Sequence, residues 1–285
     1  MSRLRVVKGH GTGNDFIIVP DLDGRLELSA ELVRALCDRR FGIGADGVLR
    51  VVRSDRDPDA APMAADAALF MDYRNADGSV AEMCGNGIRV LVRYLQGQRL
   101  AGERVEVATR GGVRLAWTSG EHIAVEMGTP QVLGAGPRVA VPPHLTRAES
   151  TAVRLPNPHL VVAMPSDTAL LALDLTTPPR VEPPLPDGQN VEFVLRTGER
   201  TIRMRVHERG VGETSSCGTG ICAAVVAAAV GDGASGGDDS AWQVDVPGGT
   251  CWVTWRSDGA VVLTGPAVLV AEIELDASWL ESAGR

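Results

Sequence analysis

Basic residues are scarce in this chain of 285 residues. Lysine and arginine together number 28 against 36 acidic residues, so the net charge is −8. No block dense in lysine or arginine occurs, and neither a nucleic acid nor an anionic membrane surface is expected as a partner. Because Lys8 is the only lysine, only one side chain could form the Schiff base that pyridoxal phosphate requires.

Long apolar runs are also missing. The longest candidate, "ICAAVVAAAV" at 221–230, has ten residues, whereas a transmembrane helix needs about 20. The beginning of the chain, "MSRLRVVKGHGTGNDF", reaches glycine and histidine before an apolar stretch forms, which does not fit a secretory signal. The sequence therefore predicts no membrane segment and a cytoplasmic location.

Cysteines are few and do not form a recognisable metal or disulfide pattern. An odd number of them in a chain without a signal indicates free thiols in a reducing compartment. No CxxC pair and no Cys/His cluster with zinc spacing occurs, so no metal site is expected. The five cysteines are Cys37, Cys84, Cys217, Cys222 and Cys251.

Short apolar runs that alternate with polar residues predict a chain rich in β-strands. Proline-rich stretches at 134–145 and 176–188 are expected to be loops. Residues 53–67 and 231–240 are expected to be solvent-exposed loops. The predicted strands are 4–8, 15–19, 47–53, 68–73, a meander over 103–127, 191–196, 201–206, 242–247, 250–256 and 260–265.

Three helices are predicted. One begins after Ser29 as its N-cap and extends to Arg40. The second follows Cys84, with apolar residues at helical spacing and Gly97 as its stop. The third follows Cys217 and is apolar on every face over 221–230, which is typical of a buried helix.

The segments before these two cysteines form an internal repeat. "YRNADGSVAEMCGNG" and "VHERGVGETSSCGTG" align without gaps, with Asn75 nine residues before Cys84 and Glu208 nine residues before Cys217. The copies are too few and too long for a solenoid. Two related domains that face each other across a cleft are therefore expected.

A cysteine at a helix N-terminus lies beside unsatisfied N–H groups and the positive end of the helix dipole. These lower its pKa and favour the thiolate, and glycines beside it let an anionic ligand approach the backbone. A single such cysteine is more often structural. Two copies in matching contexts favour an acid/base pair, in which one thiolate removes a proton from carbon and the other thiol delivers one to the opposite face.

The carbanion formed in such a step needs stabilisation. Since Lys8 is the only candidate for a Schiff base and no phosphate cup is evident around it, a route without cofactor is expected. Hydrogen-bond donors at the two helix ends would then stabilise the charge on the substrate carboxylate.

Six segments in this order, "GTGNDF", "FGIGADG", "NADGSVAEMCGNGIR", "PNPH", "GQNVEF" and "ERGVGETSSCGTG", resemble diaminopimelate epimerase over nearly the whole chain. The resemblance implies an α+β fold of two pseudo-symmetric domains, each a barrel-like, mostly antiparallel sheet around a central helix. It implies domains at 1–129 and 130–265, with 266–285 packed back on the first. It also implies a homodimer without cofactor that interconverts LL- and meso-2,6-diaminopimelate, a precursor of lysine and peptidoglycan.

The resemblance assigns roles residue by residue. Cys84 and Cys217 are the expected acid/base pair, and His159 and Glu208 are expected to tune their pKa values. Gly47 stands where some family members carry glutamine, so a side-chain contact is missing there and Gly47 is only a weak candidate. The residues expected to bind the substrate are Asn14, Asn75, Gly85, Asn86, Asn157, Asn190, Glu208, Arg209, Gly218 and Thr219.

Three alternatives stay open at this point. A proline-racemase-like enzyme would share the fold and the thiol chemistry but act on a small substrate with one amino-acid end. A redox protein would use Cys84 and Cys217 as a disulfide. The third alternative is a non-catalytic ligand-binding protein of the same fold, which replacement of Cys84 or Cys217 by alanine would distinguish from the enzyme.

Overall fold

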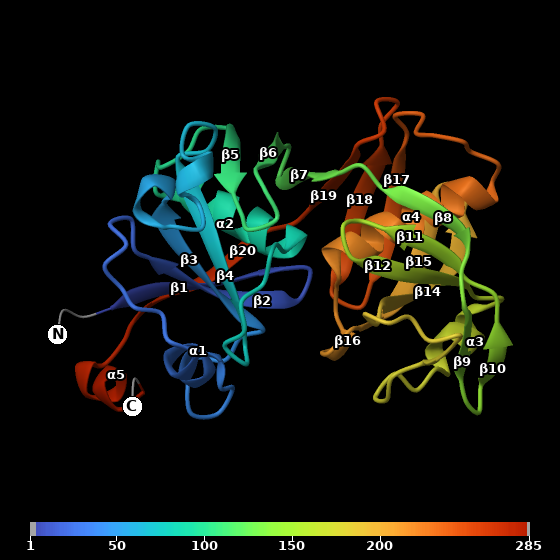
Figure 1. The fold of residues 1–285 in the computed structure, drawn as a ribbon, viewed down its shortest axis with the longest axis horizontal. Helices are drawn as coiled ribbons and strands as arrows, with labels where there is room; N and C mark the ends of the chain where they lie inside the picture. Colours follow the sequence, from blue (N-terminus) through green and yellow to red (C-terminus); the bar gives the residue numbers. More distant parts are fainter. Residues whose placement is uncertain (1–3, 284–285) are drawn as a thin grey trace. The chain divides into compact units, whose positions relative to one another are not determined.

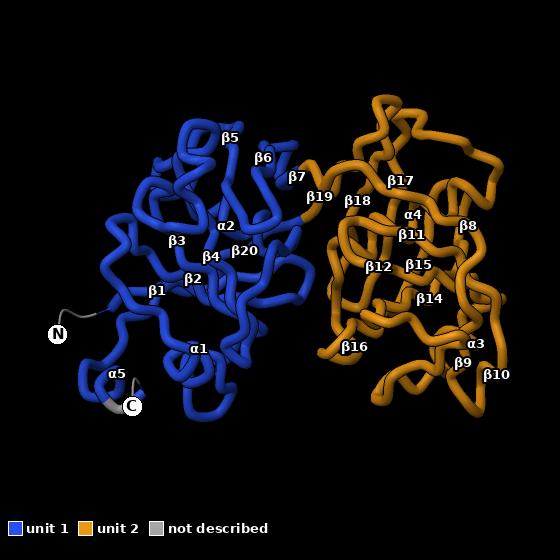
Figure 2. The backbone as a smooth tube through the Cα atoms, viewed as in Figure 1, with its two compact units in different colours: residues 1–125, 266–285 blue, residues 126–265 orange. Residues whose placement is uncertain are grey.

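The computed structural model describes residues 4–283 (Figure 1). Its internal contacts divide the chain into two compact units (Figure 2). Unit 1 comprises residues 1–125 and 266–285, and unit 2 comprises residues 126–265. The boundary at 125/126 lies four residues before the expected 129/130. Among the described residues, no helix is both long and apolar enough to span a bilayer.

Unit 1 is mostly sheet. Its helices are α1 (Ala30–Cys37), α2 (Gly85–Gly97) and α5 (Ala277–Ala283), with the short 3₁₀ turns η1 (Ser54–Arg56) and η2 (Ala61–Met63). Its strands are β1 (Arg5–Gly11), β2 (Asn14–Pro20), β3 (Gly47–Arg53), β4 (Leu69–Asn75), β5 (Arg104–Ala108), β6 (Arg114–Ser119), β7 (His122–Gly128), within which the chain passes into unit 2, and β20 (Val268–Glu274).

Unit 2 has the same character. Its helices are α3 (Asp167–Leu171) and α4 (Gly218–Gly231). Its strands are β8 (Gln131–Ala135), β9 (Arg138–Val141), β10 (Leu145–Ala148), β11 (Thr151–Arg154), β12 (Pro158–Ala163), β13 (Arg180–Glu182), β14 (Asn190–Gly198), β15 (Thr201–Glu208), β16 (Gly212–Thr214), β17 (Ala241–Val246), β18 (Gly249–Trp255) and β19 (Val261–Gly265).

The two units repeat one pattern of strand pairing. In unit 1, β2 is antiparallel to β1 and parallel to β3, β3 is antiparallel to β4, and β4 is parallel to β5. In unit 2, β12 is likewise antiparallel to β11 and parallel to β14, β14 is antiparallel to β15, and β15 is parallel to β17. The fold is therefore α+β with two pseudo-symmetric units, as the resemblance implied.

One helix forms the centre of each unit. Helix α2 packs against β1, β2, β3, β6 and β20, and α4 packs against β11, β12, β14, β15, β17, β18 and β19. Residues 221–227 of α4 are all buried, which confirms the expectation from its apolar surface. Each sheet thus wraps around a helix that begins directly after a cysteine.

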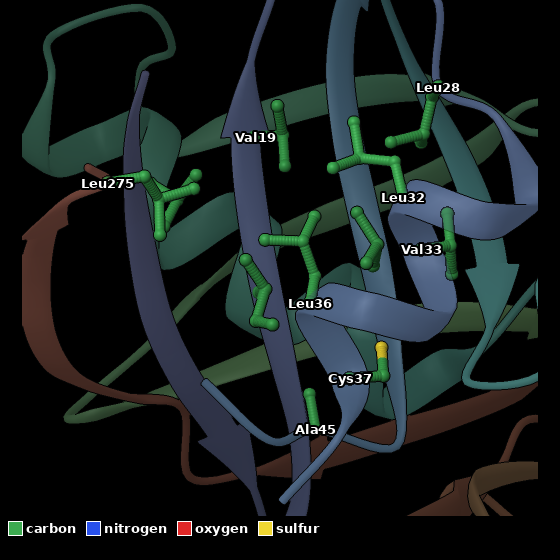
Figure 3. Packing of buried hydrophobic residues seen from close by; sticks show 11 residues of the cluster. Val19, Leu28, Leu32, Val33, Leu36, Cys37, Ala45 and Leu275 are labelled. Atoms are coloured by element: carbon green, nitrogen blue, oxygen red, sulfur yellow. The ribbon is translucent and has the colours of Figure 1, made fainter. Parts of the chain in front are cut away.

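A further core cluster lies where α1 covers the outer side of the sheet in unit 1 (Figure 3). Leu32, Val33 and Leu36 of α1 pack with Val19 and with Leu275 from the end of the chain. The Ser29 side chain accepts a hydrogen bond from the N–H of Leu32, which confirms the predicted N-cap. The helix ends at Cys37 rather than at Arg40.

The strands predicted from alternation are present, but the predicted loops needed correction. Segment 134–145 contains β9, and segment 176–188 contains β13, which pairs with β9 in a small separate sheet. These strands were missed because their apolar residues are few and prolines flank them. Gly97 is the last residue of α2 rather than a residue beyond its end.

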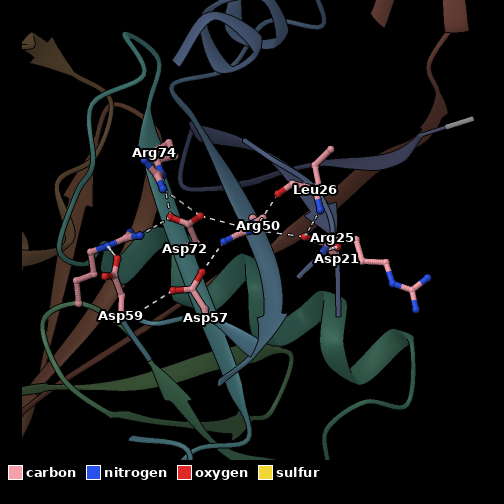
Figure 4. A network of polar contacts seen from close by, with 9 residues as sticks. Asp21, Arg25, Leu26, Arg50, Asp57, Asp59, Asp72 and Arg74 are labelled. Atoms are coloured by element: carbon pink, nitrogen blue, oxygen red, sulfur yellow. Dashed lines mark hydrogen bonds and ion pairs between the residues drawn. The ribbon is translucent and has the colours of Figure 1, made fainter. Parts of the chain in front are cut away.

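Segment 53–67 is not a uniformly exposed loop. It contains η1 and η2, and its Ser54, Asp57 and Ala60 are buried. Asp57 accepts a hydrogen bond of 2.5 Å from the buried guanidinium of Arg50 (Figure 4). An ion pair with the sheet therefore holds this segment in place.

Candidate active site

In unit 1, Cys84 is the N-cap of α2. Its Sγ accepts a hydrogen bond from the N–H of Gly87 at 3.4 Å, and Gly85 and Asn86 form the first turn. The Cys84 thiol lies 3.6 Å from Oδ1 of Asn14, which also accepts from Nδ2 of Asn86 at 3.2 Å. The structure thus brings together three of the predicted side chains and the N-terminus of the helix.

Asn14 is oriented from both sides. Its Nδ2 donates to Oδ2 of Asp46 at 2.8 Å, so the amide oxygen faces the cysteine. The preceding turn contains Thr12 and Gly13 at positive φ, and the buried Arg89 of α2 donates to Oγ1 of Thr12 at 3.2 Å. The helix that carries Cys84 therefore also positions the turn that carries Asn14.

Asn75 and Gly47 lie opposite each other in the β3–β4 pair. Nδ2 of Asn75 donates to Oγ of Ser79 within the turn that ends β4. A Cβ atom added to Gly47 would lie 2.5 Å from the carbonyl oxygen of Arg74. The backbone therefore leaves no room for a side chain at position 47.

In unit 2, Cys217 is the N-cap of α4 and only 5% exposed. Oγ1 of Thr219 lies 3.6 Å from its Sγ, and Nδ2 of Asn190 lies 4.0 Å from it. Gly218 is the first residue of the helix, where N–H groups without a partner in the helix point toward a ligand position.

Asn190 and Arg209 are joined directly. Oδ1 of Asn190 accepts a hydrogen bond of 2.9 Å from the backbone N–H of Arg209. The exposed Arg209 guanidinium donates to the carbonyl oxygen of Asp187 at 2.6 Å, which leaves most of its N–H groups available for a carboxylate.

Glu208 lies beside Cys217. Its Oε1 accepts a hydrogen bond of 2.5 Å from Oγ1 of Thr214. Burial raises the pKa of Glu208 above its ordinary value. Burial, together with the carboxylates of Glu208 and Glu192, raises the pKa of the Cys217 thiol well above its ordinary value. The prediction that the helix dipole lowers the pKa of Cys217 is therefore wrong, because desolvation and two carboxylates outweigh the dipole.

His159 is fully enclosed. Its Nδ1 lies 2.7 Å from Oε1 of Glu192, and its Nε2 lies 3.0 Å from Oδ1 of Asn157. Both side chains of the His159–Glu192 pair are 0% exposed. Glu192 was missed from the sequence, because within "GQNVEF" its position reads only as part of an alternating strand.

The remaining cysteines and the lysine have other surroundings. Cys37, Cys222 and Cys251 are buried, and burial raises the pKa of Cys37 to about 12. Lys8 forms an ion pair of 2.6 Å with Asp15 within the sheet of unit 1. Among residues 4–283, no group of three or more His, Cys, Asp or Glu side chains could hold a metal ion.

Each unit therefore presents a thiol at a helix N-terminus, with asparagine side chains beside it. This combination can exchange a proton with a carbon acid while N–H groups bind its carboxylate. A family model described as diaminopimelate epimerase matches residues 6–133 and 151–270. The chain belongs to the diaminopimelate epimerase family.

Relatives in this family are similar over their whole length. The diaminopimelate epimerase of Streptomyces coelicolor is 51% identical, over 98% of this chain and 98% of that protein. The diaminopimelate epimerase of Thermobifida fusca is 48% identical, over 97% of this chain and 100% of that protein.

Solved structures of lower identity share the fold of the diaminopimelate epimerase family. A Bacillus anthracis phenazine biosynthesis protein of the PhzF family has a TM-score of 0.68 at 16% identity and covers 97% of this chain and 100% of its own. A probable proline racemase from Agrobacterium radiobacter has a TM-score of 0.66 at 17% identity and covers 96% of this chain and 93% of its own.

Proposed function

We propose that this protein is an isomerase that interconverts LL- and meso-2,6-diaminopimelate without a cofactor. The observation that carries the proposal is the repeated cysteine at the start of a central helix in each unit, in a chain of the diaminopimelate epimerase family. The activity supplies a precursor for lysine and for peptidoglycan.

Cys84 and Cys217 act on opposite faces of the same α-carbon. The thiolate of one accepts the α-proton, and the thiol of the other donates a proton to the other face, so the configuration inverts and the total number of bound protons is unchanged. In the reverse direction, the two residues exchange roles. The N–H groups of Gly85 with Asn86, and of Gly218 with Thr219, stabilise the charge on the reacting carboxylate.

The substrate has two amino-acid ends, and the second end needs partners of its own. Arg209 suits the distal carboxylate because its guanidinium is exposed and can bind both oxygens. Asn14, Asn75, Asn157 and Asn190 can each accept from an ammonium group and donate to a carboxylate. Glu208 and His159 tune the thiol of Cys217, and Gly47 contributes backbone only.

Unit 1 serves as the N-terminal epimerase domain that carries Cys84, and unit 2 as the C-terminal epimerase domain that carries Cys217. The protein acts as a homodimer, since β20 exposes the apolar residues Val268, Leu269 and Val270 in a way typical of surfaces that a partner covers. The need for two reduced thiols fits the cytoplasm, where disulfides are rare.

Hydrogen exchange at carbon tests the function. LL-diaminopimelate incubated with the protein in D₂O, without pyridoxal phosphate, is expected to gain deuterium at one α-carbon as meso product forms. Cys84→Ala and Cys217→Ala are each expected to lower the rate of epimerisation at least about 10³-fold, since general acid–base catalysis contributes roughly that much. NMR and chiral chromatography measure the two quantities.

A variant that epimerises at the wild-type rate without one of the two thiols would refute the two-base mechanism. Proline serves as the comparison substrate. Exchange at the α-carbon of proline but not of diaminopimelate would favour the proline-racemase-like alternative, which shares the fold at low sequence identity.

A further inference from the structure

The two units place different residues at equivalent positions of their parallel strand pairs. In the parallel pair of unit 1, Phe16 lies opposite Gly47, and in the parallel pair of unit 2, His159 lies opposite Asn190. Because the pairings repeat, Phe16 corresponds to His159 and Gly47 corresponds to Asn190. A phenyl ring in one unit thus takes the position of an imidazole in the other.

The two units also differ at the next inward-facing residue of β3 in unit 1 and of β14 in unit 2. Two residues beyond Gly47 is Leu49, and two residues beyond Asn190 is Glu192. A Cβ atom on Gly87 in α2 would lie 3.3 Å from Cδ2 of Leu49, and a Cβ atom on Gly220 in α4 would lie 2.6 Å from Oε1 of Glu192. Leu49 and Glu192 therefore occupy the same place under the first turn of their helices.

Glu192 is costly to bury at this position. Its side chain is 0% exposed, and among residues 4–283 its Oε2 has no hydrogen-bond partner. A buried carboxylate with one oxygen unpaired destabilises the fold relative to an apolar residue of similar size. Because unit 1 has the apolar Leu49 at the equivalent position, the fold does not require a glutamate there. We therefore expect the carboxylate of Glu192 to have a function.

The charge lies next to the thiol. A Cβ atom added to Gly220, which would lie 2.6 Å from Oε1 of Glu192, would also lie 3.3 Å from Sγ of Cys217. Glu192 on β14 and Glu208 on β15 both oppose formation of a thiolate at Cys217, and the charge of His159 on β12 would act on Glu208. Through the same oxygen, Oε1, Glu192 also contacts Nδ1 of His159 at 2.7 Å.

The surroundings of Cys84 are different. Its thiol contacts the neutral amide of Asn14, which in turn binds Asp46, itself paired with Arg39. Asn75 stands at the position that corresponds to Glu208, nine residues before the cysteine. The residues that correspond to Glu192, Glu208 and His159 therefore carry no charge in unit 1.

We propose that Glu192 is a positioning residue that makes the two cysteines unequal: it holds His159 through Nδ1 and maintains Cys217 as the thiol before substrate binds. The proposal rests on the acid/base function proposed for the cysteines. It assigns the buried charges of unit 2 to one task, which is to keep a proton on Cys217 in the free protein.

Alkylation of each thiol as a function of pH tests the proposal. The wild-type protein, Glu192→Gln and Glu199→Gln are treated with iodoacetamide, and mass spectrometry follows the peptides that contain Cys84 and Cys217. Glu199 is a matched control, because it is an exposed glutamate in the same unit. Glu192→Gln is expected to move the alkylation midpoint of Cys217 to lower pH by about one unit, whereas the midpoint of Cys84 stays, and Glu199→Gln moves neither.

An unchanged midpoint for Cys217 in Glu192→Gln, or an equal shift for both thiols, overturns the proposal. Should Glu192→Gln fail to fold, the wild-type protein labelled with ¹⁵N-histidine decides. Its five histidines are resolved by NMR, and His159 is assigned by its loss in His159→Gln. Nδ1 of His159 that carries a proton supports the proposal, and Nδ1 without a proton overturns it. Neither readout requires turnover, so failure of the proposed function is recognised separately by the absence of exchange in D₂O.

Discussion

At the scale of single residues, the second glycine after each cysteine has a specific physical reason. Gly220 approaches Oε1 of Glu192 so closely that a methyl group would lie 2.6 Å from it, whereas a methyl group on Gly87 would meet Cδ2 of Leu49 at 3.3 Å. The first contact is well inside van der Waals distance and involves a buried carboxylate held by His159. The second involves the end of a flexible apolar side chain.

Gly220→Ala and Gly87→Ala therefore form a matched pair. Gly220→Ala is expected to lower the rate of epimerisation about 10²-fold, because the displaced carboxylate and the helix end move the thiol by a fraction of an ångström. Gly87→Ala is expected to cost less than about tenfold, since Leu49 can adjust at modest cost. Steady-state kinetics and circular dichroism of the two variants provide the comparison, and a larger loss for Gly87→Ala would contradict the assigned packing.

The residues of the site differ in how well the sequence predicted their surroundings. Cys84 and Cys217 at the helix starts follow from short motifs whose geometry is local. Asn14 and Asn190 were predicted from the family resemblance, because their contacts with the cysteines join distant positions of the chain. Glu192 could not be recognised, since one acidic residue in an alternating strand usually faces solvent. Only the fold shows that it points inward beneath the helix.

At the scale of elements, Arg50 on β3 links the neighbouring strand β4 and two loop segments of unit 1 (Figure 4). Its guanidinium donates to Asp72 on the next strand at 3.0 Å and to Asp57 in segment 53–67 at 2.5 Å. It also donates to Asp21 at 3.3 Å and to the carbonyl oxygen of Leu26 at 3.0 Å, both after β2. The side chain is only 11% exposed, so the carboxylates depend on this one cation and its arginine neighbours.

Arg50→Met is expected to lower the free energy of unfolding by about 3–5 kcal/mol, because removal of one member of a buried ionic cluster leaves the others without compensation. Arg53 lies three residues along the same strand and its side chain is exposed. Arg53→Met is therefore expected to change the free energy of unfolding by about 0.5 kcal/mol or less. Urea denaturation followed by circular dichroism measures both. Equal stability of Arg50→Met and the wild-type protein would show that the cluster contributes nothing to folding.

The elements that the sequence predicted best are those with local signals. Helix α1 has its serine cap, and α2 and α4 begin at Cys84 and Cys217 with apolar residues in their interior. Strands β9 and β13 were not predicted, because their pairing joins residues about 40 positions apart and their sequences are short and flanked by proline.

At the scale of the whole molecule, the chain returns to its first unit after completing the second. Strand β20 pairs with β1, with Val6 opposite Ile273, and Leu275 joins the cluster beneath α1. Strand β1 therefore has its neighbours β2 and β20 from opposite ends of the sequence. Unit 2, by contrast, is built from one continuous segment.

A chain that stops after Gly265 is therefore expected to lose the fold of unit 1 while unit 2 keeps its own. The truncated protein would leave β1 unpaired on one side and expose the cluster of Leu32 and Leu36, whose burial contributes about 1.5–3 kcal/mol for each side chain. Hydrogen exchange read by mass spectrometry is expected to show fast exchange in β1–β4 and protection in β14 and β15. Protection retained across unit 1 would show that residues 266–285 are dispensable for its folding.

The amino-acid sequence was sufficient to recognise the order of the motifs, the two helices that begin after cysteines, and the resemblance to the family. These depend on capping, periodicity and residue identity, which act over a few neighbouring positions. The tertiary structure was needed to show that Glu192 lies beneath Gly220, that Arg50 gathers carboxylates from three segments, and that Cys217 is buried beside the carboxylates of Glu192 and Glu208. Those outcomes depend on strands paired across long sequence separations and on charges removed from water, and no local pattern contains either.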